Sequence, residues 1–324
     1  MPDQSPTPDE LLGYFEKLNN WGRWGSDDEL GAINLITPEK VRSAAQLVRT
    51  GERISCARPL AEAPGIPGLP GYVKLMISSG ESWVAGTGKP ELWGDSQSSG
   101  DWFGMPVHGY HTHLDAPSHV FRDGKMYNGA SAGLVTTQQG ATRGAVDLVH
   151  DGIVSRGVLF DFPRLMGKSY LERGEAIHRA DLEAAEREMG VTVSAGDIVL
   201  LRTGKWARPG GSAWDDGITV TPEGVSLGAK PGLHADTLPW IRERDLSALI
   251  CDDISDLSPS GYDIVTPVHE FCLVALGVWL VDTADFERLA ERCEEEKRWE
   301  CLMMLSPLRL HNATGSPINP IAVL

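Results

Sequence analysis

Four of the nine histidines and one aspartate lie within twelve consecutive residues, most of them in the run His-Thr-His-Leu-Asp-Ala-Pro-Ser-His that ends at His119. In an extended strand, side chains at i and i+2 point the same way. His111, His113 and Asp115 would therefore share one face, and Pro117 would end the strand and turn His119 back over the same site. Imidazole and carboxylate ligands suit Zn²⁺, Mn²⁺ or Fe²⁺. The spacing thus predicts a divalent metal site.

The alternative interpretation is the polar face of a half-exposed strand, with histidines that are only hydrogen-bonded. That reading fits a lone histidine, a residue type that is common both at surfaces and in cores. We favour the metal site because clustering of His and Asp is itself a metal-site signal.

The elements that would position this segment alternate between short apolar runs and helical patterns. Strands are predicted over 53–57, 72–78, 157–162, 197–202, 246–251 and 302–308. Helices are predicted over 9–18, 38–50, 181–189, 236–244 and 284–299. The segments 64–71 and 84–104 are rich in Gly, Pro or Ser and are predicted to be loops.

Mixed strands and helices with no internal linker predict an α/β fold, a single domain with mixed β-sheets and flanking helices. We expect a polar N-terminal arm over residues 1–20 and the domain over 21–324.

The composition narrows the classes of partner. The 324 residues include 45 acidic and 29 basic side chains, which give a net charge of −16. This balance argues against nucleic acid and against an anionic membrane surface, both of which bind clustered Lys and Arg. The longest apolar run, Phe271 to Val281, is too short to span a bilayer.

The location expected from the sequence is the cytoplasm. The first residues lack the basic and apolar regions of a signal peptide. The five cysteines are odd in number and form no C-x-x-C pair, so reduced thiols are expected.

The segment Thr112 to His119 resembles the T-H-x-D-x-P-x-H signature of the cyclase family of metal-dependent hydrolases, which includes bacterial kynurenine formamidases and isatin hydrolases. The similarity extends to the segments 23–37, 196–204 and 315–320 and so covers roughly residues 21–324. The resemblance implies the swivelling β/β/α fold of that family. It also implies a homodimer or higher homo-oligomer.

Transferred residue by residue, the resemblance makes His113 and Asp115 metal ligands and His119 the acid/base histidine. Shorter members carry a further histidine four residues before the ligand histidine, where this chain has Gly109. His108 and His111 are therefore competing candidates for that ligand position.

The family's later ligands are a histidine and an acidic residue about a dozen positions further on. His269 is the better match here and Asp282 the weaker one, since Asp stands where formamidases have Glu. Trp24 and Phe103, together with Trp21, are candidates for an aromatic wall around the substrate, although each is equally plausible as core.

The expected reaction is hydrolysis of an amide, cyclic amide or lactone of a small aromatic substrate by a metal-activated water, with Mn²⁺ or Zn²⁺ as cofactor. His119 would take the proton from that water and return it to the leaving group. If two ions bind, Asp115 is the natural bridge because a carboxylate has two oxygens.

Three rival functions remain, and one of them is a non-catalytic metal or ligand binder, against which the presence of His119 beside the ligands argues. Some members of the family are thought to guide ring closure in polyketide pathways, so a metal-assisted cyclase or dehydratase is another. The third is a serine hydrolase through Ser226 in the pattern G-x-S-x-G, which Thr221-Pro222-Glu223 precedes instead of the apolar strand that a nucleophile elbow needs. Asp252, Asp253 and Asp256 are interpreted as turn-capping residues after a buried strand.

Overall fold

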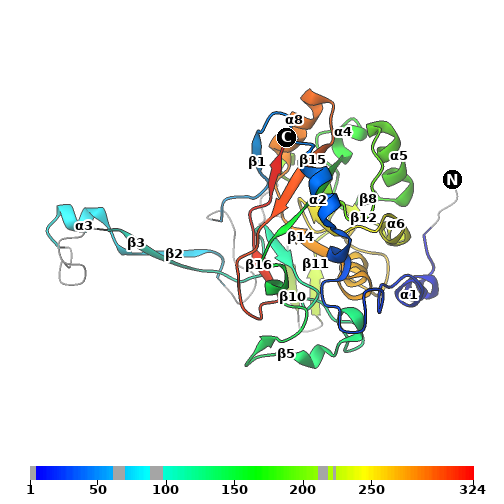
Figure 1. Cartoon of the computed structure of the whole chain (residues 1–324), viewed down its shortest axis with the longest axis horizontal. Helices are drawn as coiled ribbons and strands as arrows, with labels where there is room; N and C mark the ends of the chain where they lie inside the picture. Colours follow the sequence, from blue (N-terminus) through cyan, green and yellow to red (C-terminus); the bar gives the residue numbers. More distant parts are fainter. Residues whose placement is uncertain (1–4, 61–69, 88–97, 211–217, 222–223) are drawn as a thin grey trace.

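The computed structural model describes residues 5–60, 70–87, 98–210, 218–221 and 224–324. Within these residues, one large sheet runs through the molecule (Figure 1). Its strand order is β1 (Arg53–Ser55), β17 (Ile321–Val323), β15 (Glu300–Leu305), β7 (Ile153–Asp161), β9 (Ile198–Arg202), β13 (Ala248–Cys251), β14 (Trp279–Asp282), β4 (His113–Asp115) and β16 (Gly315–Pro317). Strands β7, β9, β13 and β14 are parallel, and the outer strands are antiparallel. The predicted single α/β domain with a mixed sheet is confirmed.

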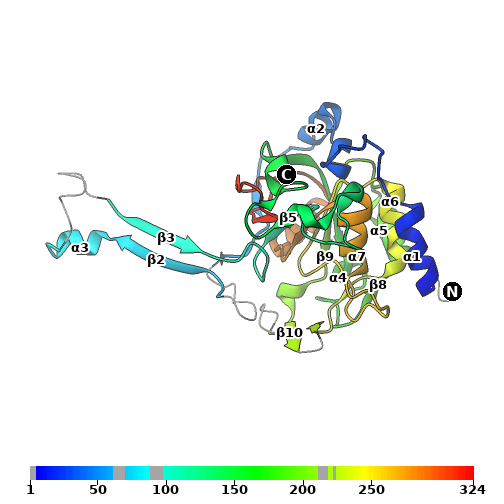
Figure 2. The ribbon, with the colours of Figure 1, turned by 90° about the horizontal axis from the view of Figure 1, so that it is seen from below.

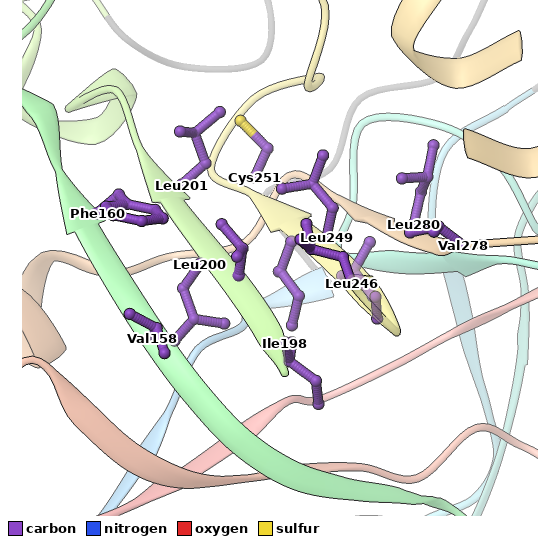
Figure 3. Close-up of a cluster of buried hydrophobic side chains, with 14 of the residues drawn as sticks. Val158, Phe160, Ile198, Leu200, Leu201, Leu246, Leu249, Cys251, Val278 and Leu280 are labelled. Atoms are coloured by element: carbon purple, nitrogen blue, oxygen red, sulfur yellow. The ribbon is translucent and has the colours of Figure 1, made fainter. Parts of the chain in front are cut away.

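The central parallel strands are buried on both faces, as continuous apolar runs require. Figure 3 shows Phe160 of β7, Leu200 of β9, Leu249 of β13 and Leu280 of β14 within this core. This core holds the carboxyl ends of β13 and β14 in place. Asp252 follows β13, and Asp282 is the last residue of β14.

Seven helices of the described chain surround the sheet or lie at its edges. They are α1 (Pro8–Lys17), α2 (Pro38–Ala45), α4 (Phe162–Leu165), α5 (Arg179–Met189), α6 (Leu238–Arg244), α7 (Pro267–Glu270) and α8 (Glu287–Glu296). Thr37 caps α2 by accepting a hydrogen bond from the Lys40 backbone N–H at 3.2 Å, and Gly190 ends α5 in the left-handed conformation. The predicted elements are largely present, most of them with shorter bounds, whereas β7 and α5 begin earlier than predicted.

One prediction was wrong in part. Residues 84–104 were expected to form a loop, but β3 (Gly100–Gly104) pairs with β2 (Val73–Ser78), and the helix α3 (Gly80–Val84) follows β2. Cross-strand pairing satisfies the backbone there, and this long-range term outweighs the local glycine content. The loop positions 64–69 and 88–97 lie outside the described residues. The β2–β3 ribbon, here called the hairpin, projects from the body in both views (Figures 1 and 2).

Three further strand pairs complete the described structure. They are β8 (Ala176–Ile177) with β12 (Gly232–Leu233), β5 (Val135–Thr136) with β6 (Gly140–Ala141), and β10 (Ile218–Thr221) with β11 (Gly224–Leu227).

The segment expected as an N-terminal arm contains α1. Its Leu11 is buried, and the Phe15 ring meets that of Phe271 edge-on with centroids 5.5 Å apart. The division into an arm over 1–20 and a domain over 21–324 stays a proposal.

A close backbone crossing fixes the segment that resembles the opening of the family. Gly31 has a φ of +61°, and a Cβ there would lie 2.4 Å from the Gly277 carbonyl oxygen. The Ala32 backbone N–H donates to that same oxygen at 2.8 Å. Only glycine fits at position 31, and this contact holds the turn before β14 in place.

Candidate metal centre

Strand β4 carries the motif and lies between β14 and β16. His113 pairs with Asp282 of β14, and Asp115 pairs with Leu280. Because successive side chains alternate, His113 and Asp115 project from one face, while Leu114 is fully buried in the core. The strand predicted for this segment is present but short, because its pairing begins only at His113.

Three side chains converge at the start of β4. The Nδ1 atom of His108 lies 2.8 Å from Oδ1 of Asp115, and Nε2 of His113 lies 3.5 Å from the same oxygen. Each residue offers one ligand atom within 4.8 Å of the others. The carbonyl oxygen of His111 is 2.7 Å from Nδ1 of His113, which directs Nε2 of that ring towards Asp115.

A second group shares Asp115 and uses its other oxygen. Nε2 of His269 lies 3.9 Å from Oδ2 of Asp115 and 3.0 Å from Oδ2 of Asp282. Asp115, His269 and Asp282 also meet the 4.8 Å spacing, and all three are buried. The two oxygens of one carboxylate therefore face two different sets of ligand atoms.

Asp256 is the residue that the sequence interpretation missed. It was taken for a turn cap, but its Oδ2 lies 2.5 Å from Nδ1 of His269 and also accepts the His269 backbone N–H at 3.2 Å. Its Oδ1 accepts the Val268 backbone N–H at 2.7 Å. A carboxylate behind the distal nitrogen fixes the tautomer and orientation of a ligand histidine. No local pattern revealed it, because the pair is thirteen residues apart and joined by a turn.

The structure separates the two competing histidines. His111 lies outside both groups: Nε2 is 3.0 Å from the Val107 carbonyl oxygen, and burial lowers the pKa of this ring to about 3. His108 is held in position by contacts with Thr314 and with Gly315 of β16. Its Nε2 lies 2.8 Å from Oγ1 of Thr314, and a Cβ on Gly315 would lie 2.7 Å from its Cε1.

His119 lies beside the first group. Its ring stacks on that of His108, with centroids 3.6 Å apart and an interplanar angle of 12°. Burial lowers the pKa of His119 to about 4, although the nearby Asp115 carboxylate acts in the opposite direction. The ring is neutral at pH 7 and able to accept a proton.

The charges of the donors suit a divalent cation. Burial alone would raise the pKa of Asp115, but His119 and His113 hold it well below its usual value, so the carboxylate is ionised. Burial acts to lower the pKa of His269, yet Asp282 and Asp256 raise it well above its usual value. The Oδ1 atom of Asp282 is buried, and no described residue gives it a hydrogen bond. A buried carboxylate oxygen with no donor is costly, and a cation would satisfy it.

The aromatic candidates lie elsewhere. The Trp24 ring packs under the Arg23 guanidinium at 4.8 Å. Phe103 is half exposed on β3 and lines a cavity of about 570 Å³ with Met105 and Pro317. Pro317 pairs with His113 across β16 and β4, so this cavity adjoins the strand that bears the ligands.

The two aspartates that follow β13 have their partners away from both ligand groups. Asp252 accepts the backbone N–H groups of Thr203, Gly204 and Lys205, and burial raises its pKa to about 6. Asp253 receives the buried ammonium groups of Lys205 at 3.0 Å and Lys230 at 2.8 Å.

Comparison with known proteins identifies the family to which the chain belongs. The Cyclase family model matches residues 54–256, a stretch that contains β4 and Asp256. A crystal structure described as a novel cyclase is 34% identical, with 95% of this chain and 100% of that chain covered and a TM-score of 0.83. The chain belongs to the cyclase family, as its motif predicted.

More distant structures share the fold. Isatin hydrolase A from Labrenzia aggregata is 19% identical over 86% of this chain and 94% of that chain, with a TM-score of 0.59. Isatin hydrolase A from Ralstonia solanacearum is 17% identical over 99% of both chains, with a TM-score of 0.55. The comparison with curated proteins finds no match.

Proposed function

We propose that the chain is a divalent-metal-dependent hydrolase that opens an amide, cyclic amide or lactone of a small aromatic substrate. The observation that carries the proposal is the buried Asp115 carboxylate, whose two oxygens face two ligand groups beside a neutral His119. Nitrogen and carboxylate donors without thiolates favour Mn²⁺ or Zn²⁺.

With Asp115, His108 and His113 would supply one set of metal ligands. With the same carboxylate, His269 and Asp282 would supply the other set. When bound, a divalent cation lowers the pKa of a coordinated water and polarises the carbonyl under attack. Asp256 keeps Nε2 of His269 directed at Asp115 and Asp282. His119 accepts a proton at an imidazole nitrogen and returns it to the leaving amine or alkoxide. The buried, low-dielectric surroundings strengthen each of these interactions.

The substrate class follows from the family and from the isatin hydrolases that share the fold. The cavity beside Phe103 is mostly apolar and has the volume of a small-molecule pocket, so we assign Phe103 to its aromatic wall. Trp24 stays a weaker candidate, since its described ring contact is with Arg23.

Metal removal tests the proposal. Protein stripped with a chelator is assayed on aryl formamides, isatin-like lactams and lactones, with and without Mn²⁺ or Zn²⁺. We expect turnover to vanish on stripping and to return with the ion. Full activity after complete removal of metal would refute the proposal.

The role of His119 is tested by His119→Ala, with the exposed His150→Ala as the matched control. Loss of general acid–base catalysis typically costs about 10²–10⁴-fold in rate. We expect that loss with metal content unchanged, and no change in the control. Wild-type rates in His119→Ala would remove the residue from this role.

The family's name supports a metal-assisted cyclase or dehydratase as the second candidate. The same panel separates the two, because a hydrolase releases an acid, whereas a cyclase or dehydratase loses water or gives an isomer. A serine hydrolase through Ser226 has little support. Ser226 lies in β11 and pairs with Thr219 of the antiparallel strand β10. A nucleophile elbow instead requires a strand-to-helix turn.

We further propose that the protein forms a homo-oligomer in which the hairpin packs on a second copy. A two-stranded ribbon is marginally stable by itself, and this one exposes the side chains of Leu75, Met76, Ile77 and Trp102. The mass in solution, measured by light scattering, should exceed 35.1 kDa and should fall in Ile77→Ser. A monomeric wild type would refute this.

The expected cytoplasmic location is part of the proposal. It is supported by five free and buried cysteines, as in a reducing compartment. Among the helices of the described residues, none has the length and apolar character needed to cross a bilayer.

A further inference from the structure

A third group of metal-ligating side chains lies apart from β4. His178, His234 and Asp236 each offer one ligand atom, and these atoms lie within 4.8 Å of one another. Among the described residues, this group shares no member with the two groups around Asp115. It sits where α5 and α6 begin, on the side of the molecule away from the hairpin (Figures 1 and 2). The proposed hydrolysis makes no use of it.

The backbone brings the two histidines together. Strands β8 and β12 pair in parallel, with Ile177 opposite Leu233. His178 and His234 are the next residue of each strand, and the His234 backbone N–H donates to the Ile177 carbonyl oxygen at 2.9 Å. The register therefore places the two imidazoles side by side, with ring centroids 4.7 Å apart.

The Asp236 carboxylate lies between the two rings. Its Oδ2 is 2.9 Å from Nδ1 of His178, and its Oδ1 is 3.2 Å from Nδ1 of His234. Nδ1 of His234 also accepts the Asp236 backbone N–H at 3.2 Å, so it presents a lone pair next to a carboxylate oxygen. Either a proton on that nitrogen or a cation would offset the repulsion between these two electron-rich atoms.

This group of three side chains is buried on one side and open to solvent on the other. His234 and Asp236 are buried, whereas the His178 side chain is 42% exposed. The Asp181 carboxylate accepts the His178 backbone N–H at 2.8 Å and so fixes the start of α5. An ion could thus enter beside His178 and complete its coordination with water.

We propose that His178, His234 and Asp236 form a separate binding site for a borderline divalent transition metal such as Zn²⁺, Co²⁺ or Ni²⁺. Two imidazoles with one carboxylate suit these ions, whereas Ca²⁺ and Mg²⁺ take oxygen ligands. Three protein ligands leave a position open for water. The bound ion would join the start of α5 to the turn before α6. This inference does not depend on the proposed hydrolysis.

The first test isolates the site. Asp115→Ala removes the shared ligand of the two groups around β4, and Zn²⁺ binding to the stripped variant is then measured by calorimetry. We expect one ion to remain per chain, with a rise in Tm on binding. Adding His178→Gln and His234→Gln should weaken that binding at least tenfold, whereas adding His150→Gln should not. Unchanged Zn²⁺ binding after both substitutions would overturn the site.

The second test uses the chain with Asp115 intact, so that it does not depend on the folding of that variant. Metal content after saturation with Zn²⁺ and desalting is compared between the wild type and His178→Gln/His234→Gln. We expect the loss of one ion per chain with hydrolysis retained. Equal metal content would overturn the proposal. If the double variant loses both the ion and its hydrolytic activity, the claim that this site is separate from the centre at Asp115 is wrong.

Discussion

Replacement of Asp256 by Asn tests whether the tertiary contact behind His269 prepares the metal centre. The carboxylate accepts four hydrogen bonds, from the Val268 N–H, the His269 N–H, Nδ1 of His269 and the Ser255 hydroxyl. An amide of the same shape has one oxygen, so its NH₂ group must face at least one of these donors. The substitution therefore removes both the charge behind the ring and a well-directed acceptor.

The expected losses of metal affinity and of folding stability follow from the position of Asp256. Loss of a partner behind a ligand histidine typically costs about 10–100-fold in metal affinity, which corresponds to about 1.4–2.8 kcal/mol. Leaving a buried donor unpaired costs a further ~1–3 kcal/mol of folding stability. We expect both losses in Asp256→Asn.

Asp252→Asn is the matched control. Asp252 is also fully buried and also accepts several N–H groups, but its partners are the backbone of Thr203, Gly204 and Lys205. It should lose stability by a similar amount while keeping its metal affinity. The assay is competition for Zn²⁺ against a coloured chelator, with urea unfolding of the stripped proteins alongside. If Asp256→Asn binds Zn²⁺ as tightly as Asp252→Asn does, Asp256 has no part in preparing the centre.

Further predictions follow from individual contacts. Gly315→Ala should weaken metal binding about tenfold or more, because the new Cβ would lie 2.4 Å from the Leu114 carbonyl oxygen and 2.7 Å from Cε1 of His108 and would displace both β4 and that ring. The chelator competition measures this loss. Gly31→Ala should lower the free energy of unfolding by about 3 kcal/mol through backbone overlap and a positive φ, whereas Gly51→Ala, with a positive φ but open space, should cost only about 1 kcal/mol. The pKa of Asp252 is raised to about 6, so the native state binds its proton more tightly than the unfolded chain. The stability of the wild type relative to Asp252→Asn, measured by urea unfolding, should therefore fall as the pH rises from about 4 to about 6 and then level off. All five cysteines are buried, so none should react with a thiol reagent at pH 8 until the protein is unfolded, when all five should react.

Local patterns in the sequence predicted much of the fold. Thr37 and Gly190 mark helix ends through capping that depends on neighbouring residues alone. The apolar run at 197–202 predicted a buried strand, and β9 is that strand. The hairpin strand β3 escaped prediction because Gly100 and Gly104 weaken its local signal, and only pairing with β2 makes it a strand.

For the candidate site, the motif by itself determined that His113 and Asp115 share a face, since alternation along a strand is a property of adjacent residues. It also kept His119 nearby through the turn at Pro117. It could not decide between His108 and His111, because that choice depends on Gly315 of β16 and on Thr314 before it, which follows His108 by 206 residues. Nor could it reveal Asp256 behind His269, or the pairing of His178 with His234 through the register of β8 and β12. Spacing in a sequence specifies direction along one element, whereas the meeting of two elements is set by packing and backbone pairing over the whole chain.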